Sequence, residues 1–414
     1  MFFVTSKKFI FLAIALLSLG DVKAYDFEVN GLYYDLLSTS EATVSFVGAK
    51  DTKDLKIPTY IVVSNRKLSV IQVDCINLKV ETLTIPESVT EIKQCQGDFR
   101  RVSIPSTIDK IAEYAFYGCK NLEELVLPTT TKRIGHGAFE NCTSLKKVKF
   151  PYGLTSIGGR AFDGAKLRNI TIPGSVTSIG GDDRGIYQYE TSFNDCSNLD
   201  TLIFEDGNQK LLFADGYQIV GRNSEEKFGE FYKCKDVLEY IYFGRNMYLR
   251  TYSYHGRGPE FHKAKVVVFG DNCMQAEIEQ TQGSNRKKTY SMSSDELKSV
   301  TFGKKMKEIP SYIESINLMK VYVRADTPQE AQGFSSNTYI KGTLYVPRGT
   351  MNKYKNASVW KEFWNIKEYD ITTDIKTPSV YNSSHSNIYN INGYKCNSEQ
   401  KGINIINGKK YFVK

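Results

Sequence analysis

The chain has 414 residues, enough for two or three ordinary domains or for one long repeat array. Its formal net charge of +8 comes from 54 Lys and Arg against 46 Asp and Glu, without a long basic run, so a nucleic-acid-binding protein is not indicated. The 27 tyrosines and 23 phenylalanines argue for a packed protein and against a disordered one.

Residues 1–24 are typical of a signal peptide. Lys7 and Lys8 precede an apolar run that begins at Phe9, and a small-residue cleavage pattern ends at Ala24. The run is too short to span a bilayer, and no later segment is apolar enough to do so. The alternative is a buried N-terminal helix. We expect cleavage near Ala24 and a protein that is secreted or held at the outer cell surface.

A repeat of 22 or 23 residues starts at each of four prolines, Pro105, Pro128, Pro151 and Pro173. An isoleucine follows six residues later, a phenylalanine eleven later and a cysteine or alanine fourteen later, and the unit closes with Leu-x-x-Leu-x-Leu. In the first three copies these positions hold Ile111, Phe116 and Cys119; Ile134, Phe139 and Cys142; and Ile157, Phe162 and Ala165. Self-similarity of this kind indicates a repeat architecture.

The closing motif can be followed from Leu55 to Val346, giving about eleven copies, with Val266–Phe269 as a possible twelfth. One copy cannot bury its apolar positions alone, whereas stacked copies share a continuous core. Alternating apolar residues predict a short strand in each copy, and successive strands would pair in parallel. We therefore expect a solenoid with a parallel β-sheet on one face and short turns, 3-10 or helical segments on the other.

The full pattern resembles the BspA-like leucine-rich repeat family. It reads Ile-Pro-x-Ser-Val-x-x-Ile-x-x-x-Ala-Phe-x-x-Cys-x-x-Leu-x-x-Leu-x-Leu-Pro and is matched best by residues 104–127 and 172–180. The resemblance spans roughly residues 26–370. It implies a leucine-rich repeat solenoid and a secreted or surface protein of the kind common in Bacteroidetes, with adhesion to a host or microbial partner.

The expected organisation is a signal peptide at 1–24, a capping β-hairpin region at 25–57, the solenoid at 58–370, a linker at 371–386 and a small C-terminal β segment at 387–414. Stretches at about 206–230, 245–260 and 270–296 are longer than a repeat needs. They are either binding loops on one face or tolerated surface insertions. The C-terminal segment resembles the sorting signals of some secreted proteins, and a small independent β cap is the alternative.

Four of the eight cysteines, Cys119, Cys142, Cys196 and Cys234, recur at one repeat position beside a core phenylalanine. A stack of buried free thiols is one interpretation, since cysteine packs as a small hydrophobe. A disulfide between neighbouring copies is the other, because their separation lies within the disulfide Cα range. Cys119 and Cys142 are the pair on adjacent unbroken copies.

Catalytic and metal-binding motifs are absent from the sequence. The four histidines His136, His255, His262 and His385 have no cysteine or carboxylate at metal-ligand spacing, and there is no nucleophile elbow or phosphate loop. We expect no metal, no cofactor and no enzymatic activity. Scattered carboxylates leave a glycosidase pair as an alternative.

The outward strand positions supply the candidate partner-binding residues. Lys146, Lys147, Lys149 and Arg168 would form a basic patch beside an acidic strand, while Tyr240 and Tyr242 would add aromatic surface. The function predicted is non-enzymatic recognition of a protein or glycan. The alternatives are a glycan-acting enzyme or its recognition subunit, and a structural envelope protein without a dissociable ligand.

Overall fold

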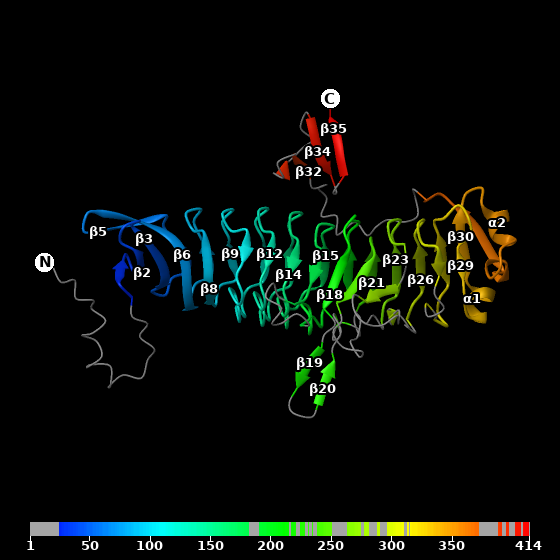
Figure 1. Ribbon diagram of the computed structural model, residues 1–414, viewed down its shortest axis with the longest axis horizontal. Coiled ribbons are helices and arrows are strands. Elements are labelled where there is room, and N and C mark those ends of the chain that lie inside the picture. Colours follow the sequence, from blue (N-terminus) through cyan, green and yellow to red (C-terminus); the bar gives the residue numbers. More distant parts are fainter. Residues whose placement is uncertain are drawn as a thin grey trace.

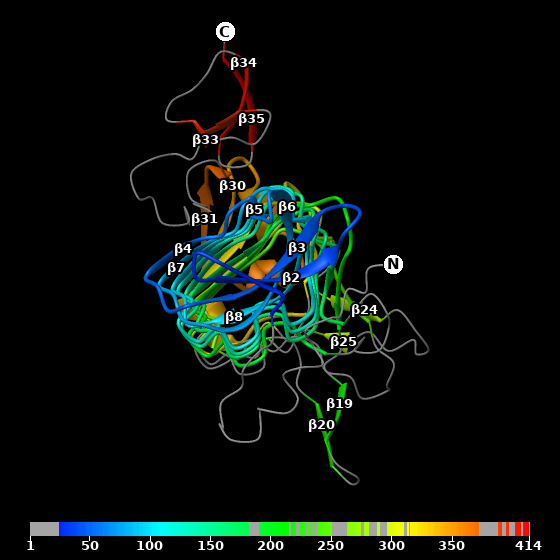
Figure 2. The same ribbon diagram turned by 90° about the vertical axis from the view of Figure 1, so that its left-hand side faces the viewer.

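The computed structural model is an elongated coil whose strands stack along the long axis (Figure 1). It describes residues 25–181, 190–214, 217–220, 224–227, 231, 234, 238–250, 263–274, 277–280, 288–289, 296–309, 313, 315–371, 388–390, 395–396, 402–406 and 409–413. The expected signal peptide, most of the expected linker, and His255, His262 and His385 lie outside these residues. Seen down the long axis, the successive turns of the chain superimpose closely (Figure 2).

One side of the coil is a row of parallel strands, here called the front sheet. It comprises β4 (Asp54–Lys56), β7 (Thr82–Thr84), β9 (Arg101–Ser103), β11 (Glu124–Val126), β13 (Lys147–Lys149), β15 (Asn169–Ile172), β17 (Thr201–Phe204), β21 (Tyr240–Phe243), β23 (Val266–Phe269), β26 (Ser299–Phe302), β28 (Lys320–Val323), β30 (Thr343–Pro347) and β31 (Asn365–Tyr369). The parallel ladder runs through β4–β9, β11–β13 and β15–β31. Single backbone bonds, such as Glu123 N to Arg100 O at 3.1 Å, join these segments.

The strands form because their alternate residues are apolar and face the core. In register, Ile170 pairs with Leu202 and Leu202 with Ile241, and all three are fully buried. Val266–Phe269, the possible twelfth copy, pairs in parallel with both neighbouring strands. β31 adds a further strand beyond the last predicted copy.

A second row of parallel strands, here called the back sheet, lies on the opposite side. It comprises β10 (Lys110–Ile111), β12 (Arg133–Ile134), β14 (Ser156–Ile157), β16 (Ser178–Ile179), β18 (Leu211–Ala214), β22 (Met247–Arg250) and β24 (Glu277–Gln280), with β25 (Lys288–Thr289) antiparallel at its end. The expectation of turns or helical segments opposite the front sheet was therefore wrong in part. The isoleucine of each copy is the buried residue of a two-residue strand, which is too short to give an alternating pattern in sequence.

A column of stacked phenylalanines lies in the segments that connect each back-sheet strand to the next front-sheet strand. The rings of Phe116, Phe139, Phe162, Phe193 and Phe231 stack in chain order with centroid separations of 5.3, 5.4, 5.3 and 5.4 Å. Backbone bonds follow the same course, for example Phe139 N to Ala161 O at 2.9 Å. Burying each ring contributes roughly 1.5–3 kcal/mol, so this column is a large part of what holds neighbouring turns together.

The stretches expected as insertions contain regular structure. β18, β22 and β24 continue the back sheet within 206–230, 245–260 and 270–296, so these stretches are not wholly loops. A separate antiparallel hairpin, β19 (Tyr217–Val220) with β20 (Ser224–Lys227), projects from the coil (Figure 1). The strands β18, β22 and β24 are only four residues long and lie in stretches without the repeat spacing, so they were not predicted from sequence.

The two ends carry different structure. At the N-terminal end, β1 (Phe27–Val29), β2 (Leu32–Ser38), β3 (Thr43–Ala49), β5 (Tyr60–Val63), β6 (Arg66–Leu78) and β8 (Glu91–Gly97) form one mixed sheet. At the C-terminal end, α1 (Ser336–Lys341), α2 (Met351–Lys355) and the 3-10 helix η4 (Trp360–Glu362) lie beside β30 and β31, and β27 (Glu308–Ile309) pairs with β29 (Glu330–Ala331). The last described strands, β32 (Ile388–Asn390), β33 (Lys395–Cys396), β34 (Gly402–Ile406) and β35 (Lys409–Val413), are antiparallel.

Candidate functional site

A column of charged side chains runs along the front sheet. The residue immediately before each front-sheet strand from β4 to β26 is charged and at least partly exposed. In chain order these residues, here called the charged column, are Lys53, Glu81, Arg100, Glu123, Lys146, Arg168, Asp200, Glu239, Lys265 and Lys298. Because successive strands stack, each member lies beside the next along the sheet.

Opposite charges pair between neighbouring members of the charged column. Lys53 lies 3.5 Å from Glu81, and Arg100 lies 3.9 Å from Glu81 and 2.9 Å from Glu123. Further along, Lys265 lies 2.6 Å from Glu239. Hydrogen bonds from Arg100 hold the pKa of Glu123 below its ordinary value. Exposed pairs of this kind are worth about 0–1 kcal/mol each, so the column contributes more to surface character than to stability.

The basic patch predicted from sequence lies at the first of three like-charge steps in the charged column; the later ones are Asp200 with Glu239 and Lys265 with Lys298. Lys146 and Arg168 are consecutive members of the charged column with the same sign. Lys147 and Lys149 project from β13 between them, and all four side chains are exposed. The structure therefore brings the four residues together on two neighbouring strands.

Acidic residues lie close to the basic patch, and the charge of Lys146 contributes to lowering the pKa of Glu123. Lys147 lies 2.7 Å from Glu124, its register partner on β11, and Arg168 lies 3.4 Å from Asp200. The Lys147 side chain is still 72% exposed and that of Arg168 69% exposed. Their charges consequently remain open to a partner from solvent.

The two tyrosines do not belong to an exposed surface. Tyr242 is only 8% exposed and packs with Ile203 and Val268, and Tyr240 is half-buried against the same cluster. Tyr242 Oη donates a 2.9 Å hydrogen bond to Asp206, and burial raises the pKa of both phenols. The expectation of aromatic recognition surface at Tyr242 was wrong, because outward strand parity does not decide whether a position is covered.

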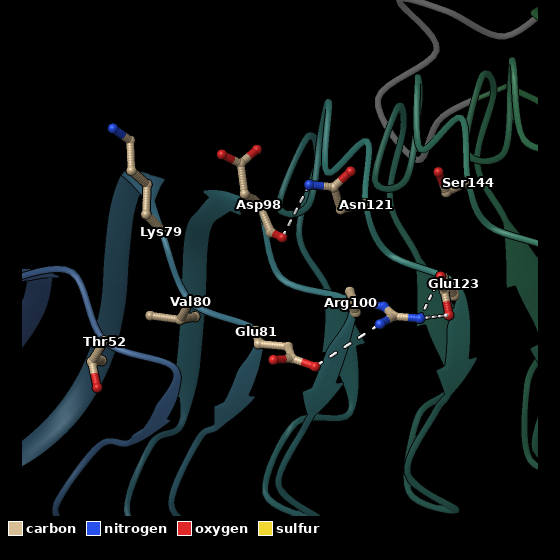
Figure 3. A pocket seen from close by; sticks show the side chains of 9 residues that line it. All are labelled: Thr52, Lys79, Val80, Glu81, Asp98, Arg100, Asn121, Glu123 and Ser144. Atoms are coloured by element: carbon tan, nitrogen blue, oxygen red, sulfur yellow. Dashed lines mark hydrogen bonds and ion pairs between the residues drawn. The ribbon is translucent and has the colours of Figure 1, made fainter.

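A shallow groove of about 570 Å³ lies near the start of the charged column (Figure 3). The residues that line it are Thr52, Lys79, Val80, Glu81, Asp98, Arg100, Asn121, Glu123 and Ser144. Arg100 reaches between the carboxylates of Glu81 and Glu123, and Asn121 donates to the backbone oxygen of Asp98 at 3.3 Å. Eight of the nine lining residues are polar or charged, and the groove faces the same side as the basic patch.

A buried charged cluster lies on the turn side, and it was not predicted from the sequence. His136 is 2% exposed and contacts the Glu190 carboxylate through Nε2, while Arg160 pairs with the buried Glu140. Burial raises the pKa of Glu140, although the Arg160 and His136 charges oppose that effect. Glu190, which follows residues 182–189 in sequence, is therefore linked to His136 in the repeat.

Metal ligation and disulfide bonding find no support among the described residues. No three His, Cys, Asp or Glu side chains in that part of the chain are grouped so that they could hold a metal ion. Seven buried cysteines are outside any disulfide: Cys75, Cys95, Cys119, Cys142, Cys196, Cys234 and Cys273. Cys142 Sγ donates to Phe116 O at 3.3 Å. No helix there is long and apolar enough to cross a membrane.

Short parallel strands that stack turn upon turn, with the same buried residues in every turn, define a leucine-rich repeat solenoid. The model of the BspA type leucine rich repeat region matches residues 72–200 in six copies, so this part of the chain carries repeats of that type. The resemblance predicted from sequence is thereby confirmed.

Several solved structures share similarity with the chain. The pneumococcal vaccine antigen PcpA is 16% identical, with 83% of this chain and 98% of that chain covered and a TM-score of 0.36. A leucine-rich repeat protein from Bacteroides ovatus is 17% identical, with 84% and 100% covered and a TM-score of 0.30. A leucine rich cell surface protein from Faecalibacterium prausnitzii is 16% identical, with 83% and 94% covered and a TM-score of 0.32. The search of curated protein sequences finds no match.

Proposed function

We propose that the protein is a secreted or cell-surface binding protein that recognises a protein or glycan through the basic patch of its front sheet. The observation that carries this proposal is the grouping of four exposed cations on β13 and beside β15, at the like-charge step between Lys146 and Arg168. Like charges side by side on a strand ladder are destabilising. A basic patch that costs stability suits an anionic partner that neutralises it.

Export supports the same function. The basic, apolar and small-residue succession of residues 1–24 is typical of a secretory signal, and the BspA-like family that the chain resembles includes secreted and surface proteins. A rigid solenoid presents a long, preformed surface, which lowers the ordering cost of binding. Adhesion to another cell or its matrix is the activity that combines an exported chain with such a surface.

A glycan-acting enzyme is the second candidate, and the groove residues weigh against it. A glycosidase needs one carboxylic acid with a raised pKa and one carboxylate. In the groove, Arg100 contacts both Glu81 and Glu123, and it lowers the pKa of Glu123. A guanidinium that lowers the pKa of Glu123 favours its ionised form, so Glu123 is poorly suited to act as the general acid.

Binding can be tested with the mature chain, residues 25–414, against a panel of extracellular-matrix proteins and acidic glycans on a biosensor. The test variant is Lys146→Glu/Lys147→Glu/Lys149→Glu. The matched control is Lys132→Glu/Arg133→Glu, which reverses two exposed cations of the same repeat on the back-sheet side.

We expect a ligand whose affinity falls with increasing salt, since exposed charges are screened. The triple variant should lose that binding while the control retains it. Equal loss in both variants would indicate attraction by net charge alone. No binding by the unchanged protein to any member of the panel would favour a structural envelope protein.

A further inference from the structure

The charged column ends abruptly in the last three strands of the front sheet. The equivalent positions before β28, β30 and β31 hold Met319, Gly342 and Trp364, and two further apolar residues, Ile316 and Ile340, lie in the segments that lead to β28 and β30. We call Ile316, Met319, Ile340 and Trp364 the apolar stripe. A position that is charged along the rest of the sheet has become apolar at one end.

The apolar stripe is open to solvent. Trp364 is 74% exposed, Ile316 66% and Ile340 42%. By contrast Trp360, four residues before Trp364, is fully buried and donates its indole N–H to Gln329 O at 2.7 Å. Soluble proteins seldom expose several large apolar side chains together unless they bind something there.

Backbone bonds place the members of the stripe side by side. Trp364 N donates to Tyr339 O at 2.9 Å, and Thr343 N donates to Met319 O at 2.9 Å. Asn337 in α1 donates to Ile316 O. Three successive turns of the solenoid therefore contribute to one continuous surface.

Gly342 occupies the register position between Met319 and Trp364 and has no side chain. An added Cβ there would meet Thr338 O at 2.5 Å, so the backbone is too close for any other residue. The register position next to Trp364 is thus bare backbone. An indole with such a neighbour can receive a flat group against one of its faces.

A polar row lies directly alongside the apolar stripe. The row consists of three register partners on β28, β30 and β31, namely Lys320, Thr343 and Asn365. They directly follow Met319, Gly342 and Trp364 in sequence. Lys320 and Asn365 are exposed and Thr343 is half-buried. Apolar and hydrogen-bonding groups therefore run side by side across the last three turns.

We propose that this end of the solenoid binds a neutral β-linked oligosaccharide whose pyranose ring packs on Trp364. A pyranose offers an apolar C–H face and a rim of hydroxyls, which matches an indole beside a polar row. A second protein copy fits less well, because three exposed side chains offer roughly 300–400 Å² against about 800 Å² per partner in a stable interface. The polar row has one cation, Lys320, so the charge of this site does not favour an acidic glycan over a neutral one. This site is independent of the basic patch.

The two tryptophans make the proposal directly measurable. Acrylamide quenches exposed Trp364, whereas buried Trp360 is protected, so quenching of the native mature chain reports on Trp364. Cellohexaose and laminarihexaose are titrated into the protein with acrylamide present, and calorimetry measures their affinity separately. The variants are Trp364→Ala and Trp364→Phe, each checked by its thermal unfolding curve.

We expect saturable protection of Trp364 by at least one of the two sugars. By calorimetry, Trp364→Ala should bind about tenfold more weakly, while Trp364→Phe keeps an aromatic face and most of the affinity. Lys146→Glu/Lys147→Glu/Lys149→Glu should bind the sugar as the unchanged protein does. The absence of protection by both sugars would overturn the proposal. So would protection by phosphatidylcholine–phosphatidylserine vesicles alone, or protection that rises only with protein concentration.

Discussion

Phe116 and Phe139 lie face to face, with ring centroids 5.3 Å apart and an interplanar angle of 3°. They occupy the same position in two successive repeats, 23 residues apart in sequence. Phe139 stacks equally on Phe162 at 5.4 Å, so each ring in the column contacts both neighbours. The stacking adds to the strand pairing that couples neighbouring turns, and each turn contacts its neighbours along the axis, as expected for a quasi-one-dimensional fold.

Phe139→Ala should therefore destabilise the solenoid by about 3–5 kcal/mol, the usual cost of removing a fully buried phenylalanine. Denaturant unfolding followed by circular dichroism measures this, and loss of the ring from the middle of the column should also broaden the transition. Val126→Ala, a change at a side chain 55% exposed on a neighbouring turn, is the control. Comparable loss in both variants would show that the column is not what couples the turns.

The buried cysteines should be chemically inert in the folded protein. Hydrogen bonding to Cys119 and burial hold the pKa of the Cys142 thiol well above its ordinary value, and the thiolate is the reactive form. In a Cys396→Ser variant, a thiol reagent at neutral pH should label almost nothing before denaturant is added and all remaining cysteines afterwards. Rapid labelling of the native protein, or an intact-mass deficit from a disulfide, would contradict this.

Cys142→Ala tests the same position by packing. The third repeat already holds Ala165 there, fully buried, so the site tolerates the smaller side chain. We expect a loss of about 1 kcal/mol, from one buried group and a small cavity. Binding to any partner of the basic patch should be unchanged. A loss of binding without a loss of stability would assign Cys142 a role in recognition.

Glu205 provides a pH-dependent contribution whose sign is fixed. Burial raises the pKa of its carboxyl above 4.5, although Gly174 N, Tyr152 Oη and the Arg245 charge oppose that effect. Above pH 4.5 the unfolded chain has begun to release this proton while the folded chain still holds it. The free energy of unfolding therefore falls as pH rises from 4.5 through the folded pKa.

Glu205→Gln removes that titration and keeps a hydrogen-bond acceptor. Urea unfolding at a series of pH values should show the original protein losing stability relative to the variant across that window. Below pH 4.5 the gap should level off, because both states are protonated. Nearby Arg245 is buried, donates to Pro173 O, Gly174 O and Val176 O, and has a pKa lowered to about 10 by burial, so it stays charged throughout. A gap that widens toward low pH would refute the assignment.

Most of the fold could be predicted from the repeat period, for a physical reason. A residue that is buried in every turn must be apolar in every turn, so the front-sheet strands and the phenylalanine column were visible in sequence. The back sheet was not, because strands such as Ser156–Ile157 are too short to alternate. Regular back-sheet strands were likewise hidden inside segments that appeared to be insertions.

The candidate site was predictable only in part. Lys146, Lys147, Lys149 and Arg168 were placed together because register follows from repeat position. The burial of Tyr242 depends on its neighbours and on what lies over the sheet, which strand parity does not report. The contact between His136 and Glu190 joins residues 54 apart through a stretch without repeat pattern, so no spacing in the sequence could indicate it.

Reversing the lysines should separate stability from recognition. Lys147→Glu faces Glu124 at the position of a present ion pair, so it exchanges a weak attraction for a weak repulsion. With Lys146→Glu and Lys149→Glu added, we expect the free energy of unfolding to change by no more than about 1 kcal/mol in total, because all three side chains are exposed. The double exchange Glu124→Lys/Lys147→Glu restores the pair with its direction reversed and should recover stability. If recognition depends on the position of the cation, this exchange will not recover binding. Full recovery in a biosensor measurement would mean that only the net charge of the face matters.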